Sequence, residues 1–514
     1  MSADIKKLQN GSDVRGIALE GVADEHVNLT GEACNKIGQA FVKWLSKKTG
    51  KNACDLKIGI GRDSRVSGPA LEEAVVKGMV AEGSKVVRCG LATTPSMFMS
   101  IVFEQTKFDG SVEITASHLP FNRNGLKFFD KDGGLEHDDI TDILAIASEL
   151  SERDCDISSC ESFDLLSLYA EHLKNAIQTQ ISKSNCGDTV AASNGAAYDK
   201  PLAGLKIVVD SGNGASGFFV DKILQPLGAD TTGSQFLEPD GMFPNHIPNP
   251  ENKQAMEAIR SAVLNNKADL GLIFDTDVDR MSAVLSDGSE VNRDAIIAMA
   301  AAILAPENPG STIITDSVTS DRLTYFLEDC LGLKHLCYMR GYKNVINKQK
   351  ELNEKGINSP LAMETSGHGA LKENYYLDDG AYLAVKLIVA LAQARAQEKK
   401  LDSLIEKLPP LVEEGEYRFK ILCEDFKEYG KSVLEQFRLR AEKAGYVLPQ
   451  SFEGVRISFK DGDAQGWMLL RLSLHDPVMP LNIEGARKGD VEKIKAIARE
   501  LLNGFDKLDM SALK

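Results

Sequence analysis

The sequence has no apolar run long enough to cross a membrane. Its longest uninterrupted run, Ala295 to Ala305, is well short of the roughly 18–20 residues that a spanning helix needs. The first residues carry acidic side chains and no apolar stretch, so they predict neither a secretory nor an organelle-targeting signal. We therefore expect a cytoplasmic protein with no membrane partner; a plastid location stays open if a transit peptide has been removed.

The sequence also lacks a basic excess and a regular cysteine pattern. The net charge of −16 argues against a nucleic-acid or anionic-membrane binder, so an anionic substrate would need a local cluster of cations. The nine cysteines are odd in number and scattered, and the Cys155/Cys160 pair has no second pair to complete a zinc site. Reduced thiols are the simpler interpretation.

Short apolar strands alternate with helical patterns, which is typical of βαβ units and an α/β fold. This plan recurs in four segments: Leu56 to Gly68, Leu205 to Leu224, Ala268 to Arg280 and Ser311 to Leu323. From about residue 412 the pattern changes to α+β. A linker-like stretch at Ser182 to Gly204, a Pro/Gly break near residue 306 and Leu408 to Leu411 suggest four domains, at 1–190, 191–296, 297–410 and 411–514.

An acidic motif, FDTDVDR at Phe274 to Arg280, directly follows an apolar strand. Alternate side chains of an extended segment share one face, so Asp275, Asp277 and Asp279 are expected to converge on one hard cation. An EF-hand is excluded, because Arg280 stands at the sixth position and Ser286 at the twelfth. A solvated acidic turn is the alternative.

A serine motif, TASHLPFNRNGLKFF at Thr115 to Phe129, follows the strand-like GSVEI. Ser117 is expected on a strand-to-loop turn, with His118 beside it and Lys127 ten residues later. A hydroxyl so placed near cations and a metal can carry a phosphoryl group. No G-x-S-x-G elbow surrounds Ser117, so a protease-type triad is the wrong interpretation, and an ordinary Ser-His turn stays open.

Taken in order, these motifs closely resemble the α-D-phosphohexomutase family of phosphoglucomutases and phosphomannomutases. GSDVRG with Ser12, Arg15 and Gly16 is similar to the family's N-terminal phosphate-contacting segment. The other matching segments are GRDSRVSG at Gly61 to Gly68, the loop at Pro239 to Asn252, ETSGHG at Glu364 to Gly369, and RLSLHDP at Arg471 to Pro477. The resemblance spans about residues 11 to 485.

The resemblance implies three similar α/β domains with mixed sheets and a C-terminal α+β domain, arranged around a central cleft. The four domains would carry the phosphoserine loop, the metal loop, the sugar-binding loop and the phosphate-binding loop in that order. The implied reaction interconverts hexose 1-phosphate and hexose 6-phosphate, with glucose favoured and mannose also open. It proceeds through phosphorylated Ser117 and a bisphosphorylated sugar, with a hexose 1,6-bisphosphate as activator.

The resemblance also assigns site residues. One Mg²⁺ per chain would be held by Asp275, Asp277, Asp279 and the phosphate on Ser117. Catalytic groups would be Ser117, His118, Lys127, Arg15 and Arg280. Substrate contacts would come from Glu364, Ser366, His368, Lys343, Arg471, Ser473 and His475. The partner is a small sugar phosphate, and the chain is expected as a monomer or homodimer.

The chain departs from the family pattern at two loops. Leu119 stands where the family has Asn, and Leu474, His475 and Asp476 replace a Gly-Thr-Glu sequence in the C-terminal loop. A leucine restricts the close backbone approach to phosphate that glycine allows. Two alternatives therefore stay open: a mutase-fold sugar-phosphate sensor or scaffold with weakened catalysis, and an acetylhexosamine phosphate mutase.

Overall fold

The computed structural model describes residues 4–186, 199–473 and 476–513. The chain divides into two compact units. The first comprises Met1–Asn292, Ser366–Gly369 and Leu377–Leu401; the second comprises Arg293–Thr365, Ala370–Tyr376 and Asp402–Lys514. Two residues of the C-terminal loop, Leu474 and His475, lie outside the described residues.

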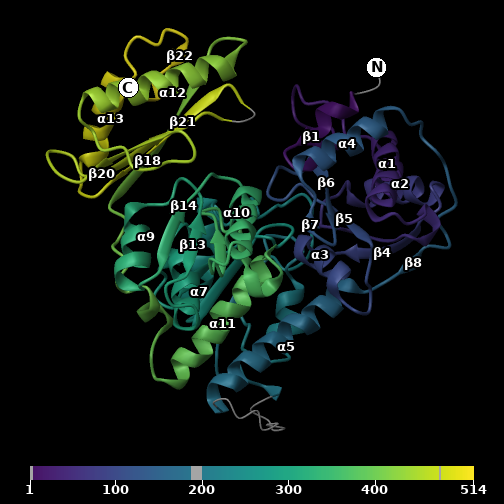
Figure 1. Ribbon diagram of the computed structural model, residues 1–514. Coiled ribbons are helices and arrows are strands. Elements are labelled where there is room, and N and C mark those ends of the chain that lie inside the picture. The colour runs from purple at the N-terminus through teal and green to yellow at the C-terminus, as the bar shows by residue number, and fades with distance from the viewer. Residues whose placement is uncertain (1–3, 187–198, 474–475, 514) are drawn as a thin grey trace. The chain divides into compact units, whose positions relative to one another are not determined.

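The N-terminal part of the first unit is built on a mixed sheet with strand order β1-β2-β6-β5-β3-β4-β8 (Figure 1). β3 pairs in parallel with β4 and β5, whereas β6 pairs antiparallel with β5 and β2. The strands are β1 (Gln9–Asn10), β2 (Asp13–Ile17), β3 (Lys57–Arg62), β4 (Lys85–Leu91), β5 (Gly110–Ile114), β6 (Arg123–Asp130), β7 (Gly133–Gly134) and β8 (Glu161–Ser162). The helices are α1 (Gly31–Thr49), α2 (Gly68–Ala81), α3 (Thr94–Val102) and α4 (His137–Ser148).

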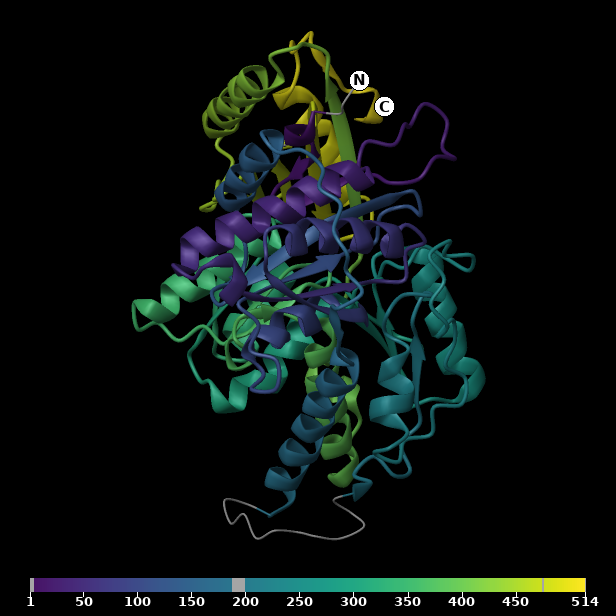
Figure 2. The same ribbon diagram turned by 90° about the vertical axis from the view of Figure 1, so that its right-hand side faces the viewer.

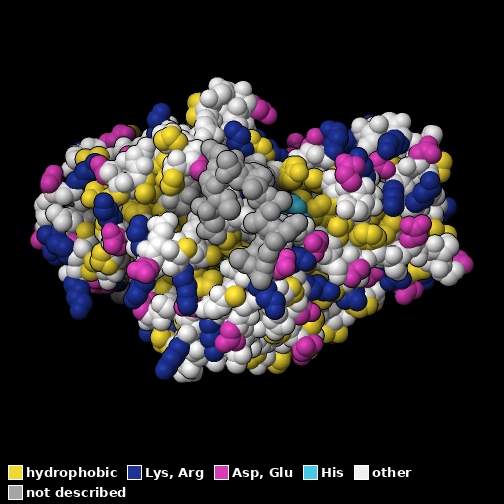
Figure 3. All heavy atoms as spheres, turned by 90° about the horizontal axis from the view of Figure 1, so that it is seen from below, with side chains coloured by type: hydrophobic (Ala, Val, Ile, Leu, Met, Phe, Trp, Pro, Cys, Tyr) yellow, Lys and Arg dark blue, Asp and Glu magenta, His cyan; other side chains and the backbone are white. Residues whose placement is uncertain are grey.

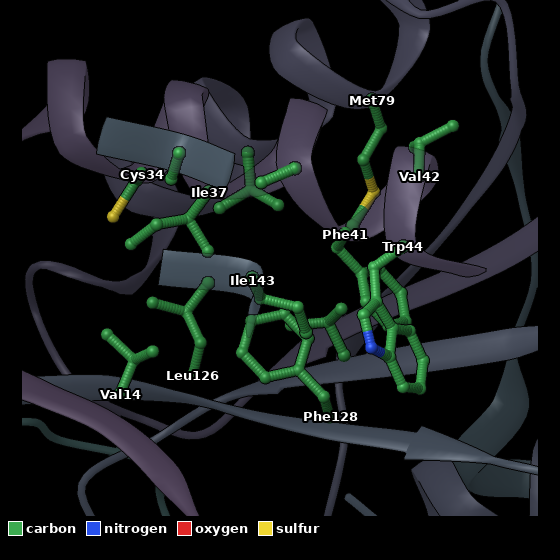
Figure 4. Close-up of a cluster of buried hydrophobic side chains, with 14 of the residues drawn as sticks. Val14, Cys34, Ile37, Phe41, Val42, Trp44, Met79, Leu126, Phe128 and Ile143 are labelled. Atoms are coloured by element: carbon green, nitrogen blue, oxygen red, sulfur yellow. The ribbon is translucent and has the colours of Figure 1, made fainter. Parts of the chain in front are cut away.

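Helix α1 is capped at both ends by its flanking residues, Thr30 and Gly50. The Thr30 hydroxyl accepts a hydrogen bond from the Ala33 N–H, and Gly50 closes the helix in a left-handed conformation with φ 73°. Its apolar face packs on the sheet, where Phe41 lies against Phe128 with ring centroids 4.9 Å apart (Figure 4). The tight core fixes the sheet, and with it the ends of β5 and β6, which carry the serine motif.

The rest of the first unit contains a second mixed sheet, of strand order β12-β11-β10-β9, and two long helices. β10 pairs in parallel with β9 and antiparallel with β11. α5 and α11 lie side by side (Figures 1 and 2), and the Tyr169 hydroxyl on α5 donates to Asp379, the N-cap of α11. The elements are α5 (Leu165–Cys186), β9 (Ile207–Asp210), α7 (Lys253–Asn266), β10 (Leu270–Phe274), β11 (Met281–Leu285), β12 (Glu290–Val291), β17 (Leu377–Asp378) and α11 (Gly380–Ala396). Strand β16 (Gly369–Leu371) begins at the last residue of the segment Ser366–Gly369 and continues into the second unit.

In the second unit, β13 pairs in parallel with β14 and β15, and a separate C-terminal sheet is antiparallel. The first part comprises α8 (Asp294–Leu304), β13 (Thr312–Thr315), α9 (Asp321–Tyr325), β14 (Lys334–Cys337), α10 (Tyr342–Glu354) and β15 (Leu361–Met363). The C-terminal part comprises β18 (Glu413–Ile421), α12 (Phe426–Lys443), β19 (Val455–Phe459), β20 (Gly466–Leu470), β21 (Val478–Gly485), α13 (Asp490–Leu501) and β22 (Leu508–Asp509).

The expected fold class is confirmed: three α/β domains with mixed sheets precede a C-terminal domain with an antiparallel sheet. One local expectation is wrong. The predicted linker was to begin at Ser182, but α5 continues to Cys186; residues 187–198 lie outside the described part of the chain. Among the described residues no helix is both long and apolar enough to span a membrane. Acidic and basic side chains are interspersed on the face seen in Figure 3.

Candidate functional site

Ser117 sits on a tight turn after β5, as the sequence predicts. Its backbone has φ 51°, in the left-handed region that non-glycine residues seldom adopt. The Ser117 N–H donates to Thr115 Oγ1 (2.8 Å), and the Leu119 N–H donates to the Ala116 carbonyl (3.1 Å). The residue is 3% exposed. Its hydroxyl is therefore presented by backbone geometry and is nearly enclosed.

The aspartate motif occupies the turn between β10 and β11. Asp275, Asp277 and Asp279 each offer a carboxylate oxygen, and these oxygens lie within 4.8 Å of one another. The convergence is as expected, but the predicted reason is wrong. The segment is a turn, with Val278 at φ 67°, so its side chains are not brought together by strand alternation. The Gly380 N–H donates to the Val278 carbonyl (3.1 Å), which stabilises this conformation.

The two motifs meet at the serine hydroxyl. Ser117 Oγ donates to Asp275 Oδ2 (2.9 Å) and accepts from Arg280 Nη2 (2.9 Å), although Asp275 lies 158 positions further along the chain. Both partners are buried, so water competes little for these contacts. The Ser117 hydroxyl, a carboxylate and a guanidinium are thus in direct contact in a buried environment.

Two cationic side chains face the aspartates. Lys127 Nζ contacts Asp277 Oδ2 (3.1 Å) and Asp279 Oδ2 (2.5 Å), and Arg280 Nε lies 3.0 Å from Asp275 Oδ2. Burial and the charge of Asp279 raise the pKa of Asp275 well above its ordinary value. Burial also opposes ionisation of Asp277 and Asp279, but Lys127 together with Thr94 at Asp277, and Lys127 together with Arg280 at Asp279, lowers the pKa of each.

Two aspartate oxygens favour a cation at this cluster. Asp277 Oδ1 and Asp279 Oδ1 are buried and have no hydrogen-bond partner among the described residues. Carboxylate oxygens are the ligands that Mg²⁺ prefers, so the donor set fits a small hard cation. The buried aspartate group is thus a candidate metal site.

His118 lies beside the serine with a neutral imidazole. Its Nδ1 is 3.3 Å from Ser117 Oγ and accepts from Arg280 Nη2, so this nitrogen carries no proton. Burial and the charges of Arg280 and Arg15 lower the pKa of His118 to about 2. Arg15 itself, on β2, is paired with Asp13 (3.0 Å).

His368 reaches the same cluster from a distant loop. It forms a backbone bridge with Arg280, and its Nε2 lies 3.6 Å from Asp279 Oδ1 and 3.8 Å from Asp378 Oδ2. Nδ1 shares a 2.8 Å hydrogen bond with Ser366 Oγ. Burial and Arg280 hold the pKa of His368 well below its ordinary value.

The other predicted substrate residues belong to the second unit. Glu364 Oε1 accepts from the Gly341 N–H (2.6 Å), and Lys343 lies in the first turn of α10. Arg471 pairs with Glu453 (3.1 Å), and Ser473 Oγ accepts from the Asp476 N–H (3.2 Å). His475 lies outside the described residues.

Sequence reasoning missed several residues of the first unit's cluster. Thr94 Oγ1 donates to Asp277 Oδ2 (2.6 Å), and Asp378 faces His368. Asp279, His368 and Asp378 form a second group whose ligand atoms lie within 4.8 Å. Thr94 is the second residue of a Thr-Thr-Pro helix start, which signals helix capping rather than a site, so nothing local marks it.

Comparisons with known proteins identify the domains of this chain. Three domain families match in order: phosphoglucomutase/phosphomannomutase, alpha/beta/alpha domain I at residues 6–154, domain II at 168–288 and domain III at 292–412. A phosphomannomutase/phosphoglucomutase of Pseudomonas putida is 30% identical over 465 residues, which is 89% of this chain and 90% of that protein.

Solved structures share the fold. A phosphoglucomutase/phosphomannomutase family protein of Burkholderia thailandensis is 25% identical and superimposes with a TM-score of 0.77 over 98% of both chains. An N-acetylphosphoglucosamine mutase of Aspergillus fumigatus, solved with GlcNAc-6P and magnesium, is 10% identical with a TM-score of 0.50 and covers 87% of this chain and 77% of its own. On the domain matches and the full-length relatives together, the chain belongs to the α-D-phosphohexomutase (phosphoglucomutase/phosphomannomutase) family and is a mutase of that type.

Proposed function

We propose that this enzyme interconverts hexose 1-phosphate and hexose 6-phosphate, with glucose as the favoured sugar, through phosphorylated Ser117. One observation supports the proposal: Ser117 Oγ lies 2.9 Å from both Asp275 Oδ2 and Arg280 Nη2, and these charged side chains are buried. A phosphoryl group on this oxygen would meet a guanidinium at once and would be shielded from water, which otherwise hydrolyses a phosphoserine.

The proposed reaction has two half-steps that balance. A sugar hydroxyl attacks the phosphorus of phosphoserine, the P–Oγ bond breaks, and a bisphosphorylated sugar forms. After that sugar turns end for end, Ser117 Oγ attacks its other phosphorus and the sugar oxygen leaves. Each attacking hydroxyl must lose a proton, and the oxygen that leaves must gain one.

Residues of the first unit fit defined parts of this scheme. Following the family resemblance, we assign proton exchange to His118, whose Nδ1 lies 3.3 Å from Oγ. Because that nitrogen accepts from Arg280 Nη2 in this arrangement, the exchange requires Arg280 to release it, for example when the guanidinium turns to the phosphoryl oxygens. Arg280 donates to Oγ, and Arg15 and Lys127 supply further positive charge for phosphate. Asp275, Asp277 and Asp279 would hold Mg²⁺, which when bound offsets the negative charge of the transferring group.

The sugar and phosphate contacts remain part of the proposal. Following the family resemblance, we assign sugar contacts to Glu364, Ser366 and His368, and phosphate contacts to Lys343, Arg471, Ser473 and His475. The proposal includes four domains, at residues 1–190, 191–296, 297–410 and 411–514, a hexose 1,6-bisphosphate as activator and a cytoplasmic location.

The test combines turnover with intact-protein mass. With glucose 1-phosphate, a glucose 1,6-bisphosphate primer and Mg²⁺, a coupled assay should show glucose 6-phosphate forming. The protein treated with the primer should carry one phosphate, and Ser117→Ala should lose both this phosphate and turnover. Ser111→Ala is the matched control, because Ser111 is a buried serine of β5 whose hydroxyl donates to the Met97 carbonyl (2.6 Å).

Two outcomes would contradict the proposal. Phosphate retained on Ser117→Ala would put the nucleophile on another residue. A wild-type protein that takes up no phosphate and turns over no hexose phosphate, with glucose, mannose and N-acetylglucosamine phosphates all tried, would favour the sugar-phosphate sensor.

A further inference from the structure

Arg65 is a buried arginine next to the serine turn, and the proposed reaction gives it no direct part. It lies between β3 and α2 and is only 1% exposed, although its sequence context, GRDSRVSG, reads equally well as a surface loop. An arginine is rarely buried this fully unless its charge is compensated. Its contacts therefore indicate a specific task.

The guanidinium of Arg65 gathers the carbonyl groups of the serine turn. Nη2 donates to the carbonyls of Ser117 and Leu119, and Nη1 donates to the carbonyls of Pro120 and Arg123, at distances between 2.5 and 3.0 Å. These four acceptors span seven consecutive residues. One planar, rigid donor group thus closes the whole turn that begins at the nucleophile.

The turn needs such support, because Ser117 has φ 51°. A non-glycine residue in the left-handed region is strained and persists only where its surroundings impose it. The Arg65 hydrogen bond to the Ser117 carbonyl acts on the peptide group of the strained residue itself. If that carbonyl were released, the residue could relax and Oγ would leave its position between Asp275 and Arg280.

Arg65 is itself held on two sides. Asp63 accepts from the Arg65 N–H (2.9 Å) with Oδ1, and its Oδ2 lies 3.2 Å from Nε. On the other side the guanidinium carbon lies 5.2 Å from the centroid of the Phe243 ring. Phe243 comes from the loop at residues 239–250, which follows β9 rather than β3.

That loop approaches Arg65 at backbone distance. A Cβ added to Gly241 would stand 2.6 Å from Arg65 Cα and 2.4 Å from the Val66 nitrogen, so only glycine fits there. The loop is in turn anchored by His246, whose Nε2 lies 3.0 Å from Asp210 Oδ1. The guanidinium is therefore enclosed by two loops and has little freedom to rotate away.

We infer that Arg65 is a positioning residue for phosphoryl transfer: by binding four carbonyls it fixes the Ser117 turn so that Oγ faces Asp275 and Arg280. Within the described part of the chain its guanidinium donates to backbone carbonyls and not to Ser117 Oγ, so it acts through the backbone and not on the phosphoryl group. This inference rests on the proposed function of Ser117.

The test is Arg65→Lys, which keeps the charge but replaces the planar fork with a single ammonium. That group has three donors and cannot reach four carbonyls in this geometry. We expect kcat to fall at least about 30-fold and KM for glucose 1-phosphate to stay within twofold, because substrate contacts are not altered. Phosphate uptake by Ser117 from glucose 1,6-bisphosphate should slow by a similar factor, as followed by intact mass.

Arg88→Lys is the matched control. Arg88 lies on β4, and its Nε pairs with the buried Glu72 of α2 at 2.7 Å, so this contact does not involve the serine turn. Its kcat should stay within twofold of wild type. An Arg65→Lys protein with wild-type kcat, or one in which KM rises while kcat is kept, would overturn the inference.

A second variant covers a failure of Arg65→Lys to fold. Asp63→Asn with Arg65→Gln removes both buried charges together, so no unpaired charge is buried; Asn matches Asp in size, whereas Gln is too short to reach the four carbonyls. The same fall in kcat with steady KM supports the inference, and wild-type kcat contradicts it. The proposed function is judged separately, since its failure would appear as a wild-type protein without turnover or phosphate uptake.

Discussion

Replacing Lys127 by methionine should reveal whether the three aspartates form a cation site. The Lys127 side chain is 7% exposed, and its ammonium contacts Asp277 and Asp279 directly. Removing one partner of a buried ion pair typically destabilises a protein by about 3–5 kcal/mol, because the remaining charges stay buried. In the presence of EDTA, we therefore expect Lys127→Met to lower the free energy of unfolding of the first unit by about this amount.

The same substitution should tighten Mg²⁺ binding. Three carboxylates now face two cationic side chains, Lys127 and Arg280, and the variant leaves only Arg280. Two unit charges about 4 Å apart interact by about 4 kcal/mol at an effective dielectric constant of 20, so loss of the ammonium removes a strong repulsion. After solvent screening we expect Mg²⁺ affinity to rise at least about tenfold, which is about 1.4 kcal/mol.

Urea unfolding can follow the first unit alone, because the chain has two tryptophans, Trp44 in the first unit and Trp467 in the second. In a Trp467→Phe background, fluorescence reports on Trp44, which is 6% exposed. Unfolding is measured with EDTA and over a Mg²⁺ series, and calorimetric titration gives the affinity. Saturating Mg²⁺ should restore more stability to Lys127→Met than to its parent, since bound ligand stabilises by RT ln(1 + [L]/Kd).

Lys51→Met is the control, because Lys51 pairs with Asp109 (2.5 Å) in the same unit and the Lys51 side chain is 50% exposed. Exposed pairs contribute at most about 1 kcal/mol, and none of it should depend on Mg²⁺. Equal Mg²⁺ affinity in Lys127→Met and its parent would refute the reasoning, since it would mean that the ammonium does not oppose a cation at these aspartates.

Two further predictions concern the framework around the site. His246 is 5% exposed and bonds to both Asp210 and the Ile247 carbonyl. Burial opposes its charged form, but these two partners together outweigh burial and the pKa of His246 is raised. This pair therefore stabilises the fold fully below about pH 6.5, the ordinary pKa, and less as pH rises through the raised folded value. His246→Gln should flatten that part of the stability–pH curve in urea unfolding, and an unaltered slope would count against the ion pair. Tyr169→Phe removes the 2.6 Å hydrogen bond to Asp379, so the free energy of unfolding of the first unit should fall by about 1.5–3 kcal/mol, with no change in KM. A fall of less than about 0.5 kcal/mol would argue against this contact.

Sequence reasoning predicts the strands and the residue types of the site, but not how they converge. The strand-like GSVEI before Ser117 and the apolar run before Asp275 correctly predict β5 and β10, and both strands are buried throughout. The alternation argument for the aspartates is wrong, since the left-handed Val278 and the contact from Gly380 set the turn. Gly380 is more than a hundred residues away, so no local pattern could indicate it.

Arg65 illustrates what sequence alone leaves undecided. Its local motif does not distinguish a surface charge from a buried clamp, because the four carbonyls that it binds come from residues 117 to 123. Thr94 and Asp378 were missed for the same reason: each is ordinary in its own segment and gains its role from a partner of another loop.

The division of the chain into two units has a consequence for synthesis. The polypeptide passes from one unit to the other after residues 292, 365, 369, 376 and 401. His368 and helix α11 therefore leave the ribosome about a hundred residues after the strands on which they pack. A fragment ending near residue 292 would expose the side of α5 that binds α11, and its aspartate turn would lack the hydrogen bond from Gly380. The first unit and its aspartate site can therefore be completed only after the chain has been synthesised to residue 401.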